Sequence, residues 1–337
     1  MKKILYIGNN LAAKTSYNST MATLSKLLID ERYAVTRSSA KKNKIIRLIA
    51  MCMAVVSKGK KNDYMLIDTF STASFYYALI TSQIARLFSI KYIPILHGGN
   101  LPSRLDKSYF FSKLIFNNSY KNVTPSIYLQ QAFKEKGFDT SFIPNGIPIN
   151  EYHFKQRTVI KPKLLWVRAF DKTYNPLLAI KVVSLLKRKF TDVHLCMVGP
   201  DKDGSLEEVQ LLVAKLNLTE NIVFTGVLPK EEWHQLSENY DIFINTTDID
   251  NMPVSIIEAM ALGFPIVSTN VGGLPYLISD NMDGILVDVN NEQEMVDAIT
   301  NILESPSKVT ALSQNARLTA EKYNLKTIKN QWLNLLK

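Results

Sequence analysis

The chain has 337 residues, of which 46% are hydrophobic and 21% are charged. That length suits two domains better than one, and the composition is that of a globular protein, which excludes disorder and low-complexity structure. The net charge is +10, but residues 1–150 carry +14 and residues 151–337 carry −4. This asymmetry predicts two domains with different partners.

Two features bear on the cellular compartment. Cys52 and Cys196 lie far apart, each inside an apolar run, so we expect small packed side chains and no disulfide. The apolar run 4–7 is too short for the core of a signal peptide, and the longest apolar stretch, 45–56, is too short to span a bilayer. We expect a cytoplasmic protein, soluble or peripheral on the inner face of the plasma membrane.

Short apolar runs alternate with helical patterns in the first half of the chain. Expected strands are 3–7, 64–68 and 92–96, and expected helices are 20–29 and 74–87. In the second half the expected strands are 163–167, 194–198, 222–224, 242–245, 265–268 and 284–287. The expected helices there are 176–190, 206–216, 230–238, 254–262 and 292–304. This alternation predicts an α/β fold with parallel sheets.

The region around residues 148–162 has two prolines, mixed charges and no period, which indicates a linker. We therefore expect a Rossmann-like domain over 1–150, a linker over 151–162 and a second Rossmann-like domain over 163–312. A helical segment, 313–337, would pack back toward the first domain. Two such sheets facing each other would leave a ligand cleft between them, because ligands of open α/β sheets bind outside the carboxyl ends of the strands.

The segment from Asp250 to Pro265 follows one of these strands and opens a helix. Pro253 suits the first turn of a helix, whose free N–H groups and positive dipole end form a seat for a phosphate. Asp250 and Glu258 are eight residues apart and bracket that helix start. Carboxylates are good acceptors for sugar hydroxyls.

This segment has two acids at this spacing, and the second acid begins the run Glu258-Ala-Met-Ala-Leu-Gly-Phe-Pro265. It resembles the same segment of glycosyltransferase family four, whose members are retaining enzymes of the GT-B fold. Further segments of this sequence match the family in order. They are His97-Gly98-Gly99, Ile143-Pro-Asn-Gly-Ile147, Val167-Arg168, Met197-Val-Gly199-Pro200, Phe224-Thr-Gly226, Ile266 to Gly273 and Gly284-Ile-Leu-Val287. Each segment alone is weak, but their order along the chain is a specific signal.

The resemblance implies a role for each matched residue. Glu258 would hold the ribose of a nucleotide-sugar donor, Asp250 would contact the transferred sugar, and Arg168 with Lys172 would neutralise the leaving diphosphate. Other donor-binding residues would be Gly199, Val227, Asn251, Met252, Pro253, Val254 and Ser255. His97 would lie in the active site, and Gly98, Gly99 and Asn10 would lie on the acceptor side. The family's reaction retains the anomeric configuration and needs no metal or cofactor.

Four departures from the family pattern stand out. The first acid is Asp250, where Glu is commoner, and Lys172 follows Arg168 by four residues instead of five. Tyr276 stands where the Gly-Gly-x-Pro-Glu pattern has its glutamate. The loop Gly8-Asn9-Asn10 lacks the usual double glycine. The changed spacing makes Lys172 the least secure of the expected phosphate-binding residues.

Other functions stay open. Asp248-Ile-Asp250 has the Asp-x-Asp form that binds a divalent metal in the other large glycosyltransferase fold, although the order of the motifs favours GT-B. The four histidines are too scattered for a local metal motif. There are two alternatives. One is a different GT-B enzyme, such as a nucleotide-sugar epimerase, and the other is a non-catalytic protein that binds nucleotide sugars. A nucleic-acid-binding protein is a further class, without a supporting motif.

Lysines flank the apolar stretch 45–56, as Lys41-Lys42-Asn43-Lys44 and as Lys58-Gly59-Lys60-Lys61. A cationic and partly apolar face can dock on anionic lipid headgroups. We therefore expect a transferase that moves sugar from a UDP- or GDP-linked donor to a saccharide or lipid-linked saccharide hydroxyl, with an anionic membrane surface as a partner. The expected setting is bacterial surface polysaccharide synthesis, as capsule, O-antigen or exopolysaccharide.

Overall fold

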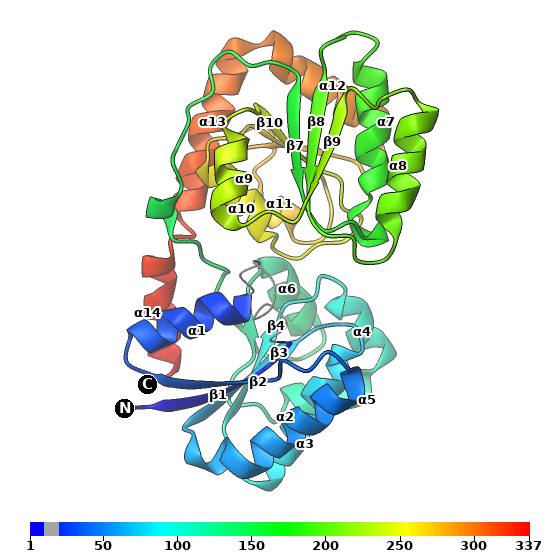
Figure 1. Cartoon of the computed structure of the whole chain (residues 1–337). Helices are drawn as coiled ribbons and strands as arrows, with labels where there is room; N and C mark the ends of the chain where they lie inside the picture. The colour runs from blue at the N-terminus through cyan, green and yellow to red at the C-terminus, as the bar shows by residue number, and fades with distance from the viewer. Residues whose placement is uncertain (10–19) are drawn as a thin grey trace. The chain divides into compact units, whose positions relative to one another are not determined.

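The computed structural model describes residues 1–9 and 20–337, so the predicted site residue Asn10 lies outside the described residues. The chain divides into two compact units. Unit 1 comprises Met1–Asn145 and Ile328–Lys337, and unit 2 comprises Gly146–Thr327. Within the described residues each unit holds one six-stranded, parallel sheet, with helices packed against it (Figure 1). The predicted α/β class with two parallel, Rossmann-like sheets is confirmed.

The sheet of unit 1 has the strand order β2-β1-β3-β4-β5-β6. Its strands are β1 (Lys3–Ile7), β2 (Ala34–Ser38), β3 (Tyr64–Thr69), β4 (Tyr92–Leu96), β5 (Val123–Thr124) and β6 (Ser141–Phe142). The helices are α1 (Thr20–Asp30), α2 (Lys44–Lys58), α3 (Ser74–Leu87), α4 (Leu101–Lys107), α5 (Tyr109–Phe116) and α6 (Ile127–Glu135), with the 3₁₀ turn η2 (Gly59–Lys61). Strands β3 and β4 are buried over their whole length, as parallel strands covered on both faces must be.

The sheet of unit 2 has the strand order β12-β11-β10-β7-β8-β9. Its strands are β7 (Lys163–Val167), β8 (His194–Val198), β9 (Ile222–Gly226), β10 (Ile242–Asn245), β11 (Ile266–Thr269) and β12 (Ile285–Val287). The helices are α7 (Pro176–Leu186), α8 (Ser205–Lys215), α9 (Lys230–Ser237), α10 (Val254–Ala261), α11 (Leu274–Leu277), α12 (Glu292–Glu304) and α13 (Pro306–Glu321), and the 3₁₀ turns are η3 (Ile149–Glu151) and η4 (Lys172–Tyr174). Apolar side chains bury both faces of this sheet.

The segment expected to be a linker, residues 151–162, lies within unit 2. Arg157 is buried there, with its guanidinium 3.6 Å from the centre of the Phe264 ring and donating to the carbonyl oxygens of Tyr240 and Leu262 at 3.0 and 2.9 Å. These hydrogen bonds satisfy a charge that would be costly to bury alone. The domain division predicted from the sequence stays a prediction.

The last helix, α14 (Leu325–Leu335), carries the chain from unit 2 into unit 1. Its Lys329 pairs with Glu31 at 2.7 Å, and Lys2 donates to the carbonyl oxygen of Leu336 at 2.7 Å. The two ends of the chain are therefore tied together in unit 1. None of the described helices is long and apolar enough to cross a membrane.

Candidate functional site

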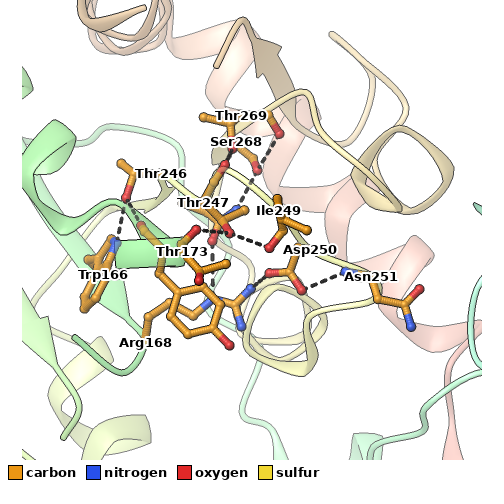
Figure 2. A network of polar contacts seen from close by, with 12 residues as sticks. Trp166, Arg168, Thr173, Thr246, Thr247, Ile249, Asp250, Asn251, Ser268 and Thr269 are labelled. Carbon is orange, nitrogen blue, oxygen red and sulfur yellow. Dashed lines mark hydrogen bonds and ion pairs between the residues drawn. The ribbon is translucent and has the colours of Figure 1, made fainter. Parts of the chain in front are cut away.

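The carboxyl ends of the central strands of unit 2 carry a polar network (Figure 2). Arg168 directly follows β7 and forms an ion pair with Asp250, with both side chains mostly buried. Its Nε donates to Asn245 Oδ1 at 3.4 Å, and its guanidinium lies 4.6 Å from the centre of the Tyr174 ring. Two predicted site residues, Arg168 and Asp250, are therefore in direct contact, although they are 82 positions apart.

The loops that hold Asp250 are braced by hydroxyl and amide groups (Figure 2). Asn245 donates to Ser268 Oγ at 3.0 Å, which links the ends of β10 and β11. Thr269 donates to the carbonyl oxygen of Thr247 at 2.6 Å, and Thr247 donates to that of Thr173 at 3.2 Å. Because these groups are buried, the bonds fix the loop between β10 and α10 in one conformation.

Glycines allow the loop after β11 to approach the backbone at Asp250. Gly273 N donates to the carbonyl oxygen of Asp250 at 3.2 Å, and a Cβ on Gly273 would collide with the carbonyl oxygen of Asn251. Gly272 has a φ of +56°, and a Cβ there would collide with the carbonyl oxygen of Asp250. Only glycine fits both positions, since any side chain would push the loops apart.

Gly199 plays a similar part at the end of β8. Its φ is +152°, and a Cβ would collide with the carbonyl oxygen of Arg168, while its N–H donates to Gly226 at 2.9 Å. The ends of β7, β8 and β9 are thereby drawn close together. Val227, a predicted donor-binding residue, follows β9 with 43% of its side chain exposed.

Glu258 lies on α10 and is buried, with 8% exposure. Its Oε1 accepts a hydrogen bond from the Tyr152 hydroxyl at 2.7 Å and an ion pair from Lys230 Nζ at 2.6 Å. Within the part of the chain that the structure describes, its Oε2 has no such partner. One carboxylate oxygen is held in place, and the other is available to a ligand.

The surroundings of Tyr152 keep its hydroxyl a donor. Burial and then the charge of Glu258 raise the pKa of Tyr152, so the phenol stays protonated at neutral pH. The His234 ring lies 4.6 Å from the Tyr152 ring, and burial followed by the charge of Lys230 lowers the pKa of His234 to about 4. A neutral imidazole therefore lies beside the Glu258–Lys230 pair.

Sequence reasoning missed Tyr152 and Lys230. Tyr152 is 106 positions from Glu258 and lies after the short turn η3, within a segment read as a linker. Lys230 is the first residue of α9, one of several lysines with no motif to distinguish it. Contact through the fold, not spacing along the chain, identifies both residues.

The start of α10 differs slightly from expectation. Pro253 is the residue that precedes the helix and not a member of its first turn, because α10 begins at Val254. The N-cap residue, Pro253, has no side-chain group that could cap the helix. The Ser255 hydroxyl is buried and has no hydrogen-bond partner among the described residues. Met252 is buried, and Asn251 N donates to Asp250 Oδ1 at 2.9 Å.

Lys172 is placed apart from the Arg168–Asp250 pair. Its side chain is 70% exposed, and its Nζ lies 3.2 Å from Glu208 on α8. Another lysine, Lys202, pairs with Asp171 at 2.5 Å and lies 5.8 Å from the centre of the Tyr174 ring that also contacts Arg168. Burial raises the pKa of Asp171, but hydrogen bonds from Lys202 and Thr173 outweigh it and lower the pKa overall.

His97 lies in unit 1, directly after β4. Its Nε2 is 2.8 Å from Asp68 Oδ1, which also accepts from the Tyr6 hydroxyl at 2.9 Å, and its ring stacks on Phe70 at 5.2 Å. Gly98 and Gly99 follow in the same loop, where a Cβ on Gly98 would lie 2.9 Å from the Ser71 amide. The sequence did not single out Asp68, the residue that orients this histidine.

The Asp248-Ile-Asp250 motif does not act as one unit. Asp248 accepts from the Asn175 side chain at 3.0 Å, whereas Asp250 pairs with Arg168. Across residues 1–9 and 20–337, no three His, Cys, Asp or Glu side chains gather in a way that could hold a metal ion.

Tyr152→Phe is expected to destabilise unit 2, because the buried Glu258 would lose one donor while the ring is kept. A hydrogen bond to a charged group contributes about 1.5–3 kcal/mol, and urea unfolding followed by tryptophan fluorescence would measure the change. Tyr174→Phe is the matched control, since among the described residues its hydroxyl has no hydrogen-bond partner while its ring contacts Arg168. Equal unfolding free energies for the two variants would contradict the role given to the Tyr152 hydroxyl.

Comparison with known proteins gives one matching family model and several more distant relatives. A family model described as "Glycosyl transferases group 1" matches residues 149–319. The amylovoran biosynthesis glycosyltransferase AmsK of Erwinia amylovora is 23% identical over 292 residues, which cover 80% of this chain and 69% of that protein. An uncharacterized glycosyltransferase of Haemophilus influenzae is 27% identical over 158 residues, 47% of this chain and 44% of that protein. This chain therefore matches less than half the length of the second relative.

A solved structure resembles the whole chain. The crystal structure of Anabaena HepE in complex with UDP-glucose superposes with a TM-score of 0.78, covering 100% of this chain and 99% of that one. The sequence identity is 18%, so the likeness concerns the fold alone.

Proposed function

The chain belongs to the glycosyl transferases of group 1, and on that basis we propose that it transfers a sugar from a nucleotide-sugar donor to a hydroxyl of a saccharide or lipid-linked saccharide. Its two Rossmann-like sheets are those of the GT-B glycosyltransferases, as predicted. We further propose that it belongs to family four and that it retains the anomeric configuration without a metal or cofactor.

The observation that carries this proposal is the state of Glu258. Its Oε1 is held by Tyr152 and Lys230, while Oε2 has no partner among the described residues. A buried carboxylate with one oxygen available is suited to accept two adjacent hydroxyl groups, such as those of a ribose. UDP-glucose is bound in the crystal structure of Anabaena HepE, which supports a nucleotide sugar as the donor class.

The start of α10 is the proposed seat of the diphosphate. Its N-cap residue, Pro253, offers no side-chain cap, and the Ser255 hydroxyl is buried without a partner in the described part of the chain. Free N–H groups and the helix dipole favour an anion at such a site. In this proposal the backbone of Asn251 to Ser255 supports the phosphate and donor sugar, and Gly199 and Val227 lie on the nucleotide side.

Arg168 and Asp250 would contact two different parts of the donor. Arg168 would stabilise the charge that develops on the leaving diphosphate, and Asp250 would contact hydroxyls of the transferred sugar. The acceptor oxygen forms a bond to the anomeric carbon as the bond to the diphosphate breaks, and the acceptor proton passes to a phosphate oxygen. Asn10, His97, Gly98 and Gly99 keep the roles that the family resemblance implies for them.

The proposed setting is bacterial surface polysaccharide synthesis, with an anionic membrane surface as a partner and the cytoplasmic side of the plasma membrane as the location. The support for this setting is the relative AmsK, whose name assigns it to amylovoran biosynthesis. The excess of lysine and arginine in residues 1–150 supports an acidic partner.

A panel of UDP-, GDP- and ADP-linked sugars is expected to identify one donor that stabilises the protein and is slowly hydrolysed. A ligand at 100 times its dissociation constant stabilises the folded state by about 2.7 kcal/mol, which a thermal shift detects. Adding EDTA should leave hydrolysis and transfer unchanged, and NMR of the product should show the donor's anomeric configuration.

Each outcome of this panel separates one alternative. Binding without turnover, across many acceptors, would favour a non-catalytic protein. Interconversion of the free nucleotide sugar would favour an epimerase. Activity abolished by EDTA and restored by manganese would revive the Asp248-Ile-Asp250 metal site. No shift with any nucleotide would contradict the proposed function altogether.

A further inference from the structure

Helix α2 carries apolar side chains on two opposite faces. Its inner face buries Arg47, Met51 and Val55, spaced four residues apart. Its outer face exposes five large apolar side chains, namely Ile45, Ile46, Ile49, Met53 and Val56. At 3.6 residues per turn the two sets lie on opposite sides of the helix. The apolar face of a surface helix normally packs against the core, yet within the described residues this outer face is left uncovered.

Neighbouring helices of unit 1 also expose apolar side chains. Helix α3 packs against both α2 and α5, and the three lie together beside the sheet of unit 1 (Figure 1). On α3 the exposed apolar side chains are Tyr76, Ile80 and Leu87, and on α5 they include Phe110 and Phe111. We call the exposed apolar residues of α2, α3 and α5 the apolar face. Several large apolar side chains exposed on adjacent helices point to an interaction site.

Lysines stand at both ends of α2. Lys41, Lys42 and Lys44 lie at its start, and Lys58, Lys60 and Lys61 lie at its end, all with exposed side chains. Buried Arg47 fixes the first group, because it donates to the carbonyl oxygens of Lys41 and Lys42 at 2.7 and 2.8 Å.

Acidic side chains do not balance these lysines. Between residues 41 and 116 the sequence has three acids, Asp63, Asp68 and Asp106. Asp68 is buried, Asp106 pairs with Lys136, and Asp63 accepts from the Lys3 backbone at 2.7 Å. The apolar face is therefore bordered by net positive charge.

We propose that the apolar face docks on an anionic lipid bilayer, with α2 lying in the plane of the headgroups. Its outer isoleucines and Met53 enter the acyl boundary, and the lysines at its two ends contact lipid phosphates. Exposed aliphatic side chains combined with lysines at both helix ends are typical of interfacial helices. A protein partner would need an apolar patch surrounded by acidic groups at matching positions. An anionic bilayer offers an apolar interior and negative headgroups everywhere, so it needs no such match.

This inference gives a definite surface to the membrane partner named in the proposed function. It rests on the proposed function only in assuming a lipid-linked acceptor. Lipid binding itself is measured without donor or acceptor. Vesicle binding can therefore fail while donor binding stands, and the reverse result is equally distinguishable.

Co-sedimentation with phosphatidylglycerol-containing vesicles tests the proposal. The full chain should pellet with these vesicles, should pellet at least tenfold less with pure phosphatidylcholine, and should be released by high salt. The double variant Ile49→Glu, Met53→Glu should lose at least tenfold of the binding. Both residues are exposed, so the fold is retained, which circular dichroism verifies. Leu211→Glu is the matched control, because Leu211 is 66% exposed on α8 of unit 2.

Three results would overturn the proposal. The first is equal binding to neutral and anionic vesicles. The second is undiminished binding of the double variant, or an equal loss with Leu211→Glu. The third is a wild-type dimer in sedimentation velocity that the double variant abolishes, with no vesicle binding by either protein, because a second copy of the chain would then be the occupant of the apolar face.

Discussion

Glu258→Gln is expected to weaken nucleotide binding by about 10- to 100-fold and to reduce transfer by at least as much. The substitution keeps the size of the side chain but removes the charge that a ribose would meet. Hydrogen bonds to a charged group contribute about 1.5–3 kcal/mol, and each 1.4 kcal/mol is a factor of ten in affinity. Calorimetric titration with the nucleotide found in the donor panel measures the change.

Stability must be followed in the same experiment, because Glu258 also pairs with Lys230 at 2.6 Å. Removing the carboxylate leaves that lysine without its partner, and Glu258→Gln will therefore destabilise unit 2 as well. The matched control is Glu304→Gln, which removes an exposed ion pair with Lys189 and should change neither property, since surface pairs contribute little. Unchanged nucleotide affinity in a folded Glu258→Gln protein would remove Glu258 from the donor site.

The central strands of the fold could be predicted from the sequence. Expected strands 163–167, 194–198 and 242–245 coincide with β7, β8 and β10, because parallel strands that are mostly buried appear as short continuous apolar runs. The edge strand β2 was missed, since its five residues are only half-buried or exposed and the apolar run is weak. Strands β5 and β6 have two residues each, too few to leave a pattern.

The helices show a similar limit. Helix α3 was predicted over its full extent, whereas the stretch 45–56 was read only as an apolar segment flanked by lysines. That stretch lies within α2 (Lys44–Lys58), and its residues 48–56 form an unbroken apolar run in which no polar residue marks the helical period. The feature that hid this helix in the sequence is the one that makes its outer face notable in the structure.

The residues of the candidate site were predicted individually, but their partners were not. Sequence reasoning selected Arg168, Asp250 and Glu258 by motif, and it gave no sign that Tyr152 or Lys230 would hold Glu258. Those contacts arise from chain segments that meet only after folding. A short motif shows which kind of side chain is present at a site. The orientation of that side chain depends on contacts between distant segments, which residue spacing does not reveal.

Arg168→Ala is expected to lower kcat by about 10²–10³, with a smaller effect on donor affinity. Removal of one group that stabilises transition-state charge typically has this magnitude. Arg168 is held for that task by Asp250, Asn245 and the Tyr174 ring, so its guanidinium is already oriented before the donor binds. Steady-state kinetics with the identified donor measure kcat and KM separately. Arg168→Lys should recover only part of the loss, because it keeps the charge but loses the planar fork.

Lys172→Met tests whether Lys172, in addition to Arg168, stabilises the negative charge of the leaving diphosphate. Lys172 is 70% exposed and pairs with Glu208, so its loss should lower kcat by less than about tenfold, in line with a screened surface charge. A loss as large as that of Arg168→Ala would show that Lys172 leaves Glu208 and reaches the phosphate when the donor binds. A small effect would make Lys202 the next candidate for this role, because its Nζ lies near the same Tyr174 ring that Arg168 contacts. A second cation is expected, since a leaving diphosphate carries more charge than one arginine neutralises.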